Sequence, residues 1–181
     1  MYCGSNKTAL QSQRQIAGAM MALIQEKPFA QITVSELCRA AGISRQTFYT
    51  LFTSRENVMV FTLQAQYCDA PEIAHPRQPQ RDGALEWLCG AYSEYILRNR
   101  RLIKLLVDNR IDYLLYDSFF EAMDSCDCFL KEVDPCVRSY AASFYAGGIA
   151  CVARRYAQEG CTTTAAELKA LLETLLSGKL F

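Results

Sequence analysis

The sequence contains few of the residues from which metal and catalytic sites are usually built. Histidine occurs once, as His75, and no two cysteines have the C-x-x-C spacing of a zinc clamp or redox motif. A Ser-His-Asp site or a histidine-ligated zinc site therefore has little support, and we expect no catalysis, cofactor or metal. No apolar run approaches the ~18–20 residues of a membrane helix, which argues against an integral membrane protein.

Alternating polar and apolar stretches, which would indicate strands, are also scarce. Apolar residues instead recur at spacings of three and four, the period of an amphipathic helix. With 51% hydrophobic and 21% charged residues among 181, the chain can bury a sizeable core. We predict an all-α protein of about nine helices.

The chain has no net charge, but its charge is unevenly distributed. It carries 19 basic and 19 acidic side chains. Residues 1–60 hold six basic and three acidic residues, and the remainder holds thirteen and sixteen, which gives about +3 and −3. Because attraction to phosphate is local, the positive N-terminal region is compatible with DNA binding.

Capping and breaking residues predict where the helices lie. In the N-terminal part, we predict one helix over about 8–26 and a second from the capping-box pattern Thr33–Glu36 to near Gly42. A third begins at Ser44, and a fourth runs from Thr53 or Ser54 to about residue 68. Residues 69–82 contain three prolines and little apolar content, so a loop is expected. Beyond it, helices are predicted around 85–96, over 102–107, over 111 to about 131, over 135–160, and from the capping box at Thr164–Glu167 onward. The predicted domains are therefore 1–68, with the fourth helix as connector, and 83–181.

The pattern of residues 33–52 is typical of a helix-turn-helix. Gly42 lies where the backbone must turn, and the expected interior consists of Leu37, Ala40, Ala41, Ile43, Phe48 and Phe52. The outer surface then consists of Arg45, Gln46, Thr47, Tyr49 and Thr50. Arginine and glutamine can make bidentate contacts to guanine and adenine respectively. Thr33 and Ser44, at helix N-termini, can offer hydroxyls and amides to DNA phosphates.

The run ITVSELCRAAGISRQTFYTLFTSRENVM, residues 32–59, closely resembles the N-terminal signature of the TetR family of bacterial transcription regulators. That signature combines a T-V-x-x-(I/L) start, A-G-(V/I)-S, (T/L)-(F/L)-Y, an aromatic F and a (K/R)-E cap, and a looser resemblance covers residues 8–68. The resemblance implies a cytoplasmic, DNA-binding regulator, for which we expect repression through a palindromic operator. It also implies that Tyr49 and Arg55 contact phosphates, while Arg45, Gln46 and Thr47 lie on the recognition helix.

Two residues depart from the family pattern. Gln46 stands where glycine, proline or another small or basic residue is frequent, and Leu51 stands where an aromatic residue or histidine is common. The operator sequence of a relative therefore does not transfer to this chain.

The C-terminal part has two apolar stripes that fit the homodimer interface implied by the resemblance, although such stripes can also face the chain's own core. Gly147 and Gly148 would permit close backbone approach. The predicted interface residues are Val137, Tyr140, Phe144, Gly148, Cys151, Val152, Leu168, Leu171, Leu172 and Leu175.

The resemblance further implies a pocket for an unidentified small-molecule effector in the C-terminal bundle. Aromatic residues could line it, and Arg110 could anchor an acidic ligand, although aromatic stripes at helical spacing are more often core. The candidate lining is Tyr92, Tyr95, Arg110, Tyr113, Tyr116, Phe119 and Phe144.

The nine cysteines are interpreted as reduced cytosolic thiols, because their number is odd and no signal-peptide pattern is present. Cys38, Cys89 and Cys151 fall at apolar helical positions and are expected to pack as small hydrophobic residues. Cys126, Cys128 and Cys136 could bind a metal or sense oxidation, but their spacing is nonspecific.

Two alternatives to the repressor remain. One is a helical ligand or thiol sensor that acts through protein contacts without operator binding. The other is a small cysteine-dependent enzyme, which the lack of a histidine partner disfavours.

Overall fold

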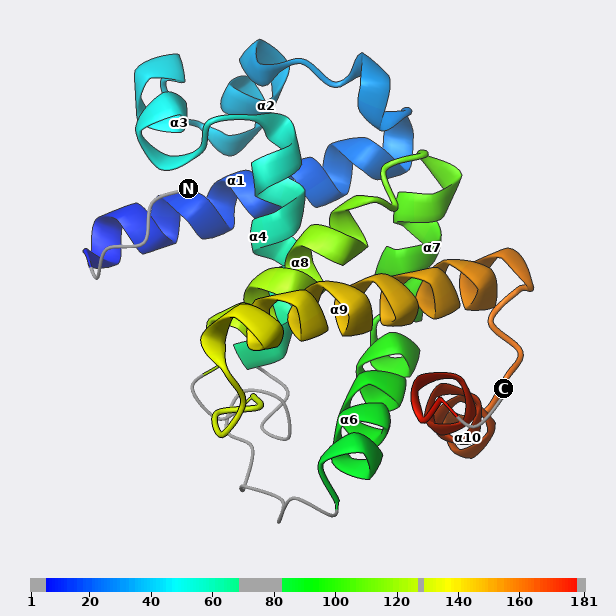
Figure 1. The fold of residues 1–181 in the computed structure, drawn as a ribbon. Coiled ribbons are helices and arrows are strands. Elements are labelled where there is room, and N and C mark those ends of the chain that lie inside the picture. The colour runs from blue at the N-terminus through cyan, green and yellow to red at the C-terminus, as the bar shows by residue number, and fades with distance from the viewer. Residues whose placement is uncertain (1–5, 69–82, 127–128, 179–181) are drawn as a thin grey trace. The chain divides into compact units, whose positions relative to one another are not determined.

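The computed structural model describes residues 6–68, 83–126 and 129–178, without the side chains of residues 67 and 68. Within these ranges all regular secondary structure is helical, and nine α-helices are present (Figure 1). The prediction of an all-α fold is confirmed. The chain forms two compact units, Met1–Leu63 and Gln64–Phe181. Among the described residues, no helix combines the length and the apolar character needed to span a bilayer.

The first unit is built on a long helix against which a short helix pair is placed. Its elements are α1 (Lys7–Glu26), the 3-10 turn η1 (Phe29–Gln31), α2 (Val34–Ala41), α3 (Arg45–Leu51) and the first part of α4 (Arg55–Cys68). α2 packs against α1, and α3 follows α2 after a tight turn (Figure 1). The largest buried side chains of this unit are Ile16, Met20, Ile32, Leu37, Phe48, Phe52, Met59 and Leu63.

The predicted caps of the first unit are largely as expected. Of the two alternatives for α4 it is Ser54 whose Oγ accepts a hydrogen bond from the Asn57 amide, at 3.3 Å. Asn6, which was not predicted as a cap, caps α1. Ser44 accepts from the Thr47 amide at 3.0 Å. These bonds satisfy amides that have no partner inside their own helix, so local side-chain chemistry determines where the helices begin.

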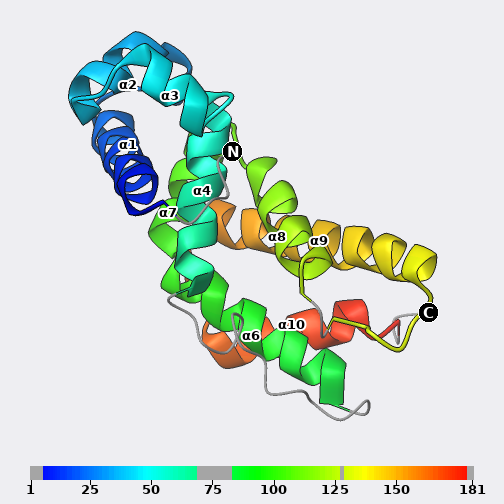
Figure 2. The same ribbon diagram turned by 90° about the vertical axis from the view of Figure 1, so that its left-hand side faces the viewer.

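The second unit consists of α6 (Ala84–Arg98), α7 (Arg100–Asp108), α8 (Leu114–Asp124), α9 (Pro135–Gln158) and α10 (Ala165–Leu176). α9 lies beside α8 and α7, and α10 lies beside α6 (Figures 1 and 2). The capping box predicted for the last helix is complete, because Thr164 accepts from the Glu167 amide while the Glu167 carboxylate accepts from the Thr164 amide. Small residues on the buried face of α9, among them Ala142, Ala146 and Ala153, allow its neighbours to pack closely.

The predicted helix over 111–131 is wrong in its boundaries, because α8 covers only Leu114–Asp124. After the end of α7 at Asp108, Arg110 adopts the left-handed conformation, at φ 58°, and the Ile111 amide donates to the Leu106 carbonyl at 3.0 Å. At the other end, the Ser125 hydroxyl donates to the Glu121 carbonyl at 2.6 Å. The predicted loop 69–82, with His75, lies outside the described residues.

Candidate nucleic-acid interface

The turn between α2 and α3 depends on Gly42. This residue adopts the left-handed conformation with φ 67°, which a side chain disfavours. The Gly42 amide donates to the Arg39 carbonyl at 3.2 Å, and the Ile43 amide donates to the Cys38 carbonyl at 3.0 Å. This pair of bonds is a Schellman motif, which ends α2 and redirects the chain into α3.

α3 has only seven residues, and its order comes from the cap before it and the aromatic side chains beneath it. The Ser44 Oγ also lies 2.8 Å from the Thr47 Oγ1, so the two hydroxyls share a hydrogen bond. Phe48 and Phe52 are buried, with ring centroids 5.9 Å apart, and Phe52 packs edge-to-face with Phe61, with ring centroids 5.7 Å apart. A helix this short is barely stable by itself, so these aromatic contacts hold it in its orientation.

Four side chains of α3 form an exposed polar surface, here termed the reading surface: Arg45, Gln46, Tyr49 and Thr50. Tyr49 is 53% exposed and packs edge-to-face with Phe48, with ring centroids 5.3 Å apart. The Thr50 hydroxyl donates to the Gln46 carbonyl at 3.0 Å, so its proton has an internal partner. Within the described part of the chain, neither the Arg45 nor the Gln46 side chain makes a hydrogen bond.

The interior of the helix-turn-helix differs from its sequence-based description at two positions. Ala40, expected inside, is exposed. Leu51 is 3% exposed and contributes to the core, so its departure from the family pattern concerns packing rather than the surface of α3. Of the two departures, Gln46 alone lies on the reading surface.

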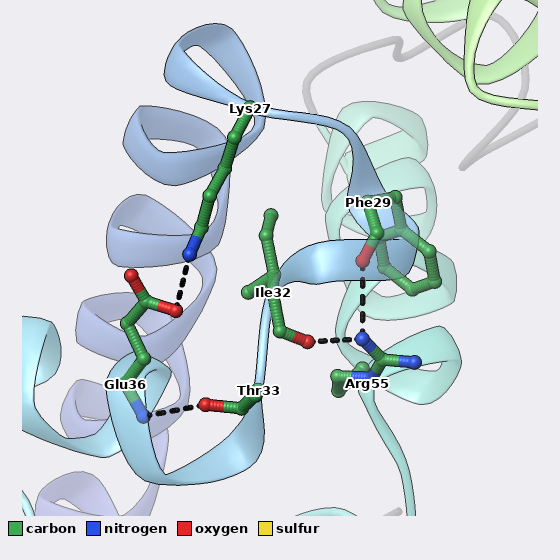
Figure 3. A network of polar contacts seen from close by, with 6 residues as sticks. All are labelled: Lys27, Phe29, Ile32, Thr33, Glu36 and Arg55. Atoms are coloured by element: carbon green, nitrogen blue, oxygen red, sulfur yellow. Dashed lines mark hydrogen bonds and ion pairs between the residues drawn. The ribbon is translucent and has the colours of Figure 1, made fainter.

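Arg55 has a different environment from the one predicted for a phosphate contact. Its Nη1 donates to the Phe29 carbonyl at 3.0 Å and to the Ile32 carbonyl, and its Cζ lies 4.9 Å from the centroid of the Phe29 ring (Figure 3). The side chain is only 25% exposed. The guanidinium is therefore bound to the chain itself. A cation at the start of a helix opposes the helix dipole, and this is a sequence clue that could have suggested another partner.

Lys27 and Glu36 link the end of α1 to the start of α2. The Lys27 Nζ lies 2.5 Å from the Glu36 Oε2 (Figure 3). This hydrogen bond holds the pKa of the Glu36 carboxyl below its ordinary value of 4.5. The Thr33 hydroxyl accepts from the Glu36 amide at 3.2 Å, but the Glu36 carboxylate faces Lys27 and not the Thr33 amide. Only half of the predicted capping box is therefore present.

The residues predicted for a dimer interface fall into three groups. Leu168 and Leu172 of α10 are buried inside their own unit, and Gly148 and Val152 are partly exposed. The rest are exposed apolar or thiol side chains, here termed the outer stripe: Val137, Tyr140, Phe144 and Cys151 of α9, with Leu171 and Leu175 of α10. Tyr140 and Phe144 are 75% and 65% exposed, which is unusual for large hydrophobic residues.

The residues predicted to line an effector pocket do not share one environment. Tyr92, Tyr95 and Phe119 are buried, and the Phe119 ring packs edge-to-face with both tyrosines, with ring centroids 5.2 and 5.7 Å apart. Burial raises the pKa of Tyr92 far above its ordinary value. Tyr113, Tyr116, Phe144 and Arg110 are exposed. The buried group has the close packing of ordinary core.

The cysteines also divide by burial. Cys38 and Cys89 are buried as expected, and burial raises the pKa of Cys89 to about 11. Cys151, which was expected to pack as a small hydrophobic residue, is exposed and does not pack inside its own chain. Cys128 lies outside the described residues, and among the described ones no group of three or more metal-binding side chains is present.

A short polar helix held by a capped turn over an aromatic core defines a helix-turn-helix protein of the transcription-regulator class. Residues 16–60 match the family model for bacterial regulatory proteins of the tetR family. The similarity of the chain to the tetR family thus lies in this N-terminal region.

Two curated relatives share part of the sequence. The HTH-type transcriptional regulator EthR of Mycobacterium tuberculosis is 46% identical over 41 residues, which are 23% of this chain and 19% of EthR. The HTH-type dhaKLM operon transcriptional activator DhaS of Lactococcus lactis is 32% identical over 63 residues, which are 35% of this chain and 34% of DhaS. The match thus spans about a fifth to a third of these relatives.

Solved structures resemble the chain over nearly its full length. Lin0861 from Listeria innocua has a TM-score of 0.74 at 15% identity and covers 98% of this chain, with 95% of its own chain aligned. FadR from Thermus thermophilus, a TetR-family transcriptional repressor in complex with lauroyl-CoA, has a TM-score of 0.53 at 20% identity, with 93% and 95% covered. At these identities the likeness shows a shared fold.

Proposed function

We propose that this chain is a sequence-specific DNA-binding transcription regulator, and that Arg45, Gln46 and Tyr49 contact its operator. The observation that carries the proposal is the exposure of these side chains on a helix whose other face is fixed by Phe48 and Phe52. A guanidinium and an amide whose hydrogen-bonding groups are free can pair with the edges of guanine and adenine in the major groove. Thr33 and Ser44, at the N-termini of α2 and α3, are proposed to lie near phosphates.

The proposal includes a homodimer formed through the outer stripe. Large exposed apolar patches mark interaction sites more often than scattered exposed residues do. A two-fold symmetric dimer would present two reading surfaces to two half-sites, so the operator should be an approximate palindrome. Among the similar proteins, DhaS is named an activator and the Thermus FadR a repressor. For this chain we propose that it represses transcription and that it acts in the cytoplasm.

The proposal also includes release by a small-molecule effector bound in the second unit. The complex of the Thermus FadR with lauroyl-CoA supports this idea, because that protein shares the fold. An effector would have to bind the DNA-free conformation more tightly than the DNA-bound one. The proposed function involves no catalytic step.

Selection of binding sites from random duplex DNA with the full chain, followed by footprinting, tests the proposal. The expected result is an enriched, two-fold symmetric site that the protein protects at physiological salt. Recovery of no enriched sequence at low salt would contradict operator binding and would favour the sensor that acts through protein contacts. Placing the enriched site over a promoter in a transcription assay then separates repression from activation.

A further inference from the structure

The start of α2 is held by contacts from α4, a segment more than twenty residues away in the sequence. Arg55 is the first residue of α4, and the Phe29 and Ile32 carbonyls that accept from its Nη1 lie 26 and 23 positions earlier. Both carbonyls belong to the turn η1 and its C-cap, directly before Thr33. One guanidinium therefore closes the connection between α1 and α2 from the side (Figure 3).

The carbonyls that Arg55 binds are part of the turn itself. The Phe29 carbonyl also accepts from the Ile32 amide at 3.1 Å, and the Pro28 carbonyl accepts from the Gln31 amide at 2.9 Å. The Ile32 carbonyl has no helical partner, since Ile32 lies outside α2, and Arg55 supplies its donor. Below the guanidinium, the Phe29 ring is 3% exposed and cannot shift freely.

From these contacts we infer that Arg55 positions the helix-turn-helix by fixing the backbone at Phe29 and Ile32, and that it acts through this backbone and not through a phosphate. The inference rests on the proposed DNA-binding function. Ile32 precedes Thr33, whose hydroxyl caps α2, so the direction in which α2 leaves this point determines where α3 and its reading surface lie. Arg55 is a positioning residue for DNA binding.

Lysine and arginine differ in a way that separates the two roles. Lysine keeps the positive charge that a phosphate contact needs. Its tetrahedral ammonium, however, is not a planar group that can lie over the Phe29 ring while one of its nitrogens donates to both carbonyls. If Arg55 acts as a phosphate contact, Arg55→Lys should therefore retain most of the function. If it acts as a positioning residue, Arg55→Lys and Arg55→Ala should resemble each other.

Amide hydrogen exchange of the free, full-length chain tests the positioning role without DNA. In Arg55→Lys, we expect exchange at Gln31, Ile32 and Leu37 to accelerate about tenfold, while amides in the middle of α1 keep their rates. Arg39→Lys is the matched control, because it makes the same change at an exposed position of α2 and should leave all these rates unaltered. Should Arg55→Ala fail to fold, Arg55→Lys alone decides the outcome.

DNA affinity measured over a range of salt concentrations provides the second readout. Both Arg55 variants should bind the selected site about tenfold more weakly with an unchanged salt slope, whereas loss of a phosphate contact lowers the slope by about 0.9. Unchanged exchange in Arg55→Lys, with a lower slope only in Arg55→Ala, would overturn the inference. Uniformly faster exchange over α1 and α2 would also overturn it, because Arg55 would then support the whole unit. The expected exchange pattern in a chain that binds no DNA would support positioning while contradicting the proposed function.

Discussion

A Cβ atom placed on Gly148 of α9 would lie 3.1 Å from the Cδ2 of Leu176 on α10. This separation is tighter than an ordinary van der Waals contact, so the absence of a side chain at Gly148 lets the two helices pack together. The adjacent Gly147 has no neighbour within 4 Å of the same added atom. Two successive glycines of one helix thus have different surroundings.

This difference predicts different effects of the same substitution. Gly147→Ala should stabilise the chain by about 0.5–1 kcal/mol, because alanine restricts the unfolded chain and favours helix. Gly148→Ala should be less stable than Gly147→Ala by about 1 kcal/mol, since Leu176 must move. Denaturant unfolding of both variants at equal protein concentration measures the difference. Equal stabilities would show that Leu176 relaxes without cost.

Substitutions on the reading surface should change which bases are preferred. Arg45→Ala and Gln46→Ala each remove one possible bidentate contact, which is worth about 1–3 kcal/mol of discrimination against the wrong base. Each variant should lose its preference at one position of a half-site and keep it elsewhere. Tyr49→Phe, which removes only a hydroxyl, serves as the comparison and should weaken binding equally on all sequences. Site selection with each variant checks this division, and an equal loss across all sequences for all three would contradict it.

The outer stripe can be tested by placing a charge in it. Phe144→Asp would place a carboxylate among apolar side chains at a dimer contact, and we expect the dimer dissociation constant to rise at least about 100-fold. Ser139→Asp introduces the same charge at an exposed position on another face of α9 and should leave dimerisation unchanged. Sedimentation over a range of concentrations measures both. A wild-type chain that stays monomeric at micromolar concentration would refute the interface.

Thiol labelling should follow burial. The pKa of Cys89 is raised from 9.0 to about 11, which leaves roughly a hundredfold less thiolate at neutral pH. We expect Cys136 and Cys151 to react in the native protein, while Cys38 and Cys89 react only after unfolding. Peptide mapping after brief alkylation assigns the sites. If the outer stripe forms the dimer, Cys151 should become protected at high protein concentration while Cys136 stays reactive.

The bond between Lys27 and Glu36 predicts a dependence of stability on acidity. Because the folded-state pKa of Glu36 lies below its ordinary value of 4.5, the bond contributes fully above that pH and is lost as the pH falls through the lowered pKa. Glu36→Gln should therefore have a lower free energy of unfolding than the wild type at pH 7, and the difference between the two should become smaller below pH 4.5. Glu26→Gln, which makes the same change at an exposed position, is the control. Unfolding curves between pH 3 and 7 check both, and a constant difference would exclude a contribution from ionised Glu36.

Local chemistry made much of the first unit predictable. Thr33, Ser44 and Gly42 act through bonds to residues no more than five positions away, so a short stretch of sequence contains both partners. The hydrogen bonds of Arg55 could not be predicted in this way, because its partners are backbone carbonyls in a distant turn and every residue carries such a carbonyl. Sequence spacing therefore could not single out Phe29 and Ile32.

In the second unit, helical periodicity did not predict which apolar faces are buried. The spacing of Phe144, Cys151 and Leu168 indicates apolar helix faces, but it does not say whether a face meets the same chain or solvent. In the structure Leu168 is buried while Phe144 and Cys151 are exposed. The helix predicted over 102–107 ends within one residue of the end of α7 at Asp108. The turn that follows it was not predicted, because arginine rarely adopts the left-handed conformation that Arg110 has.

Arg45 and Gln46 can be substituted during evolution with little effect on the fold. Neither side chain is hydrogen-bonded to the described part of the chain, so exchanging them should leave the folded state nearly as stable as before. Phe48, in the same short helix, has no such freedom. If the reading surface contacts the operator as proposed, mutations at Arg45 and Gln46 can redirect the protein to a new set of genes in small steps, each of which still yields a folded molecule.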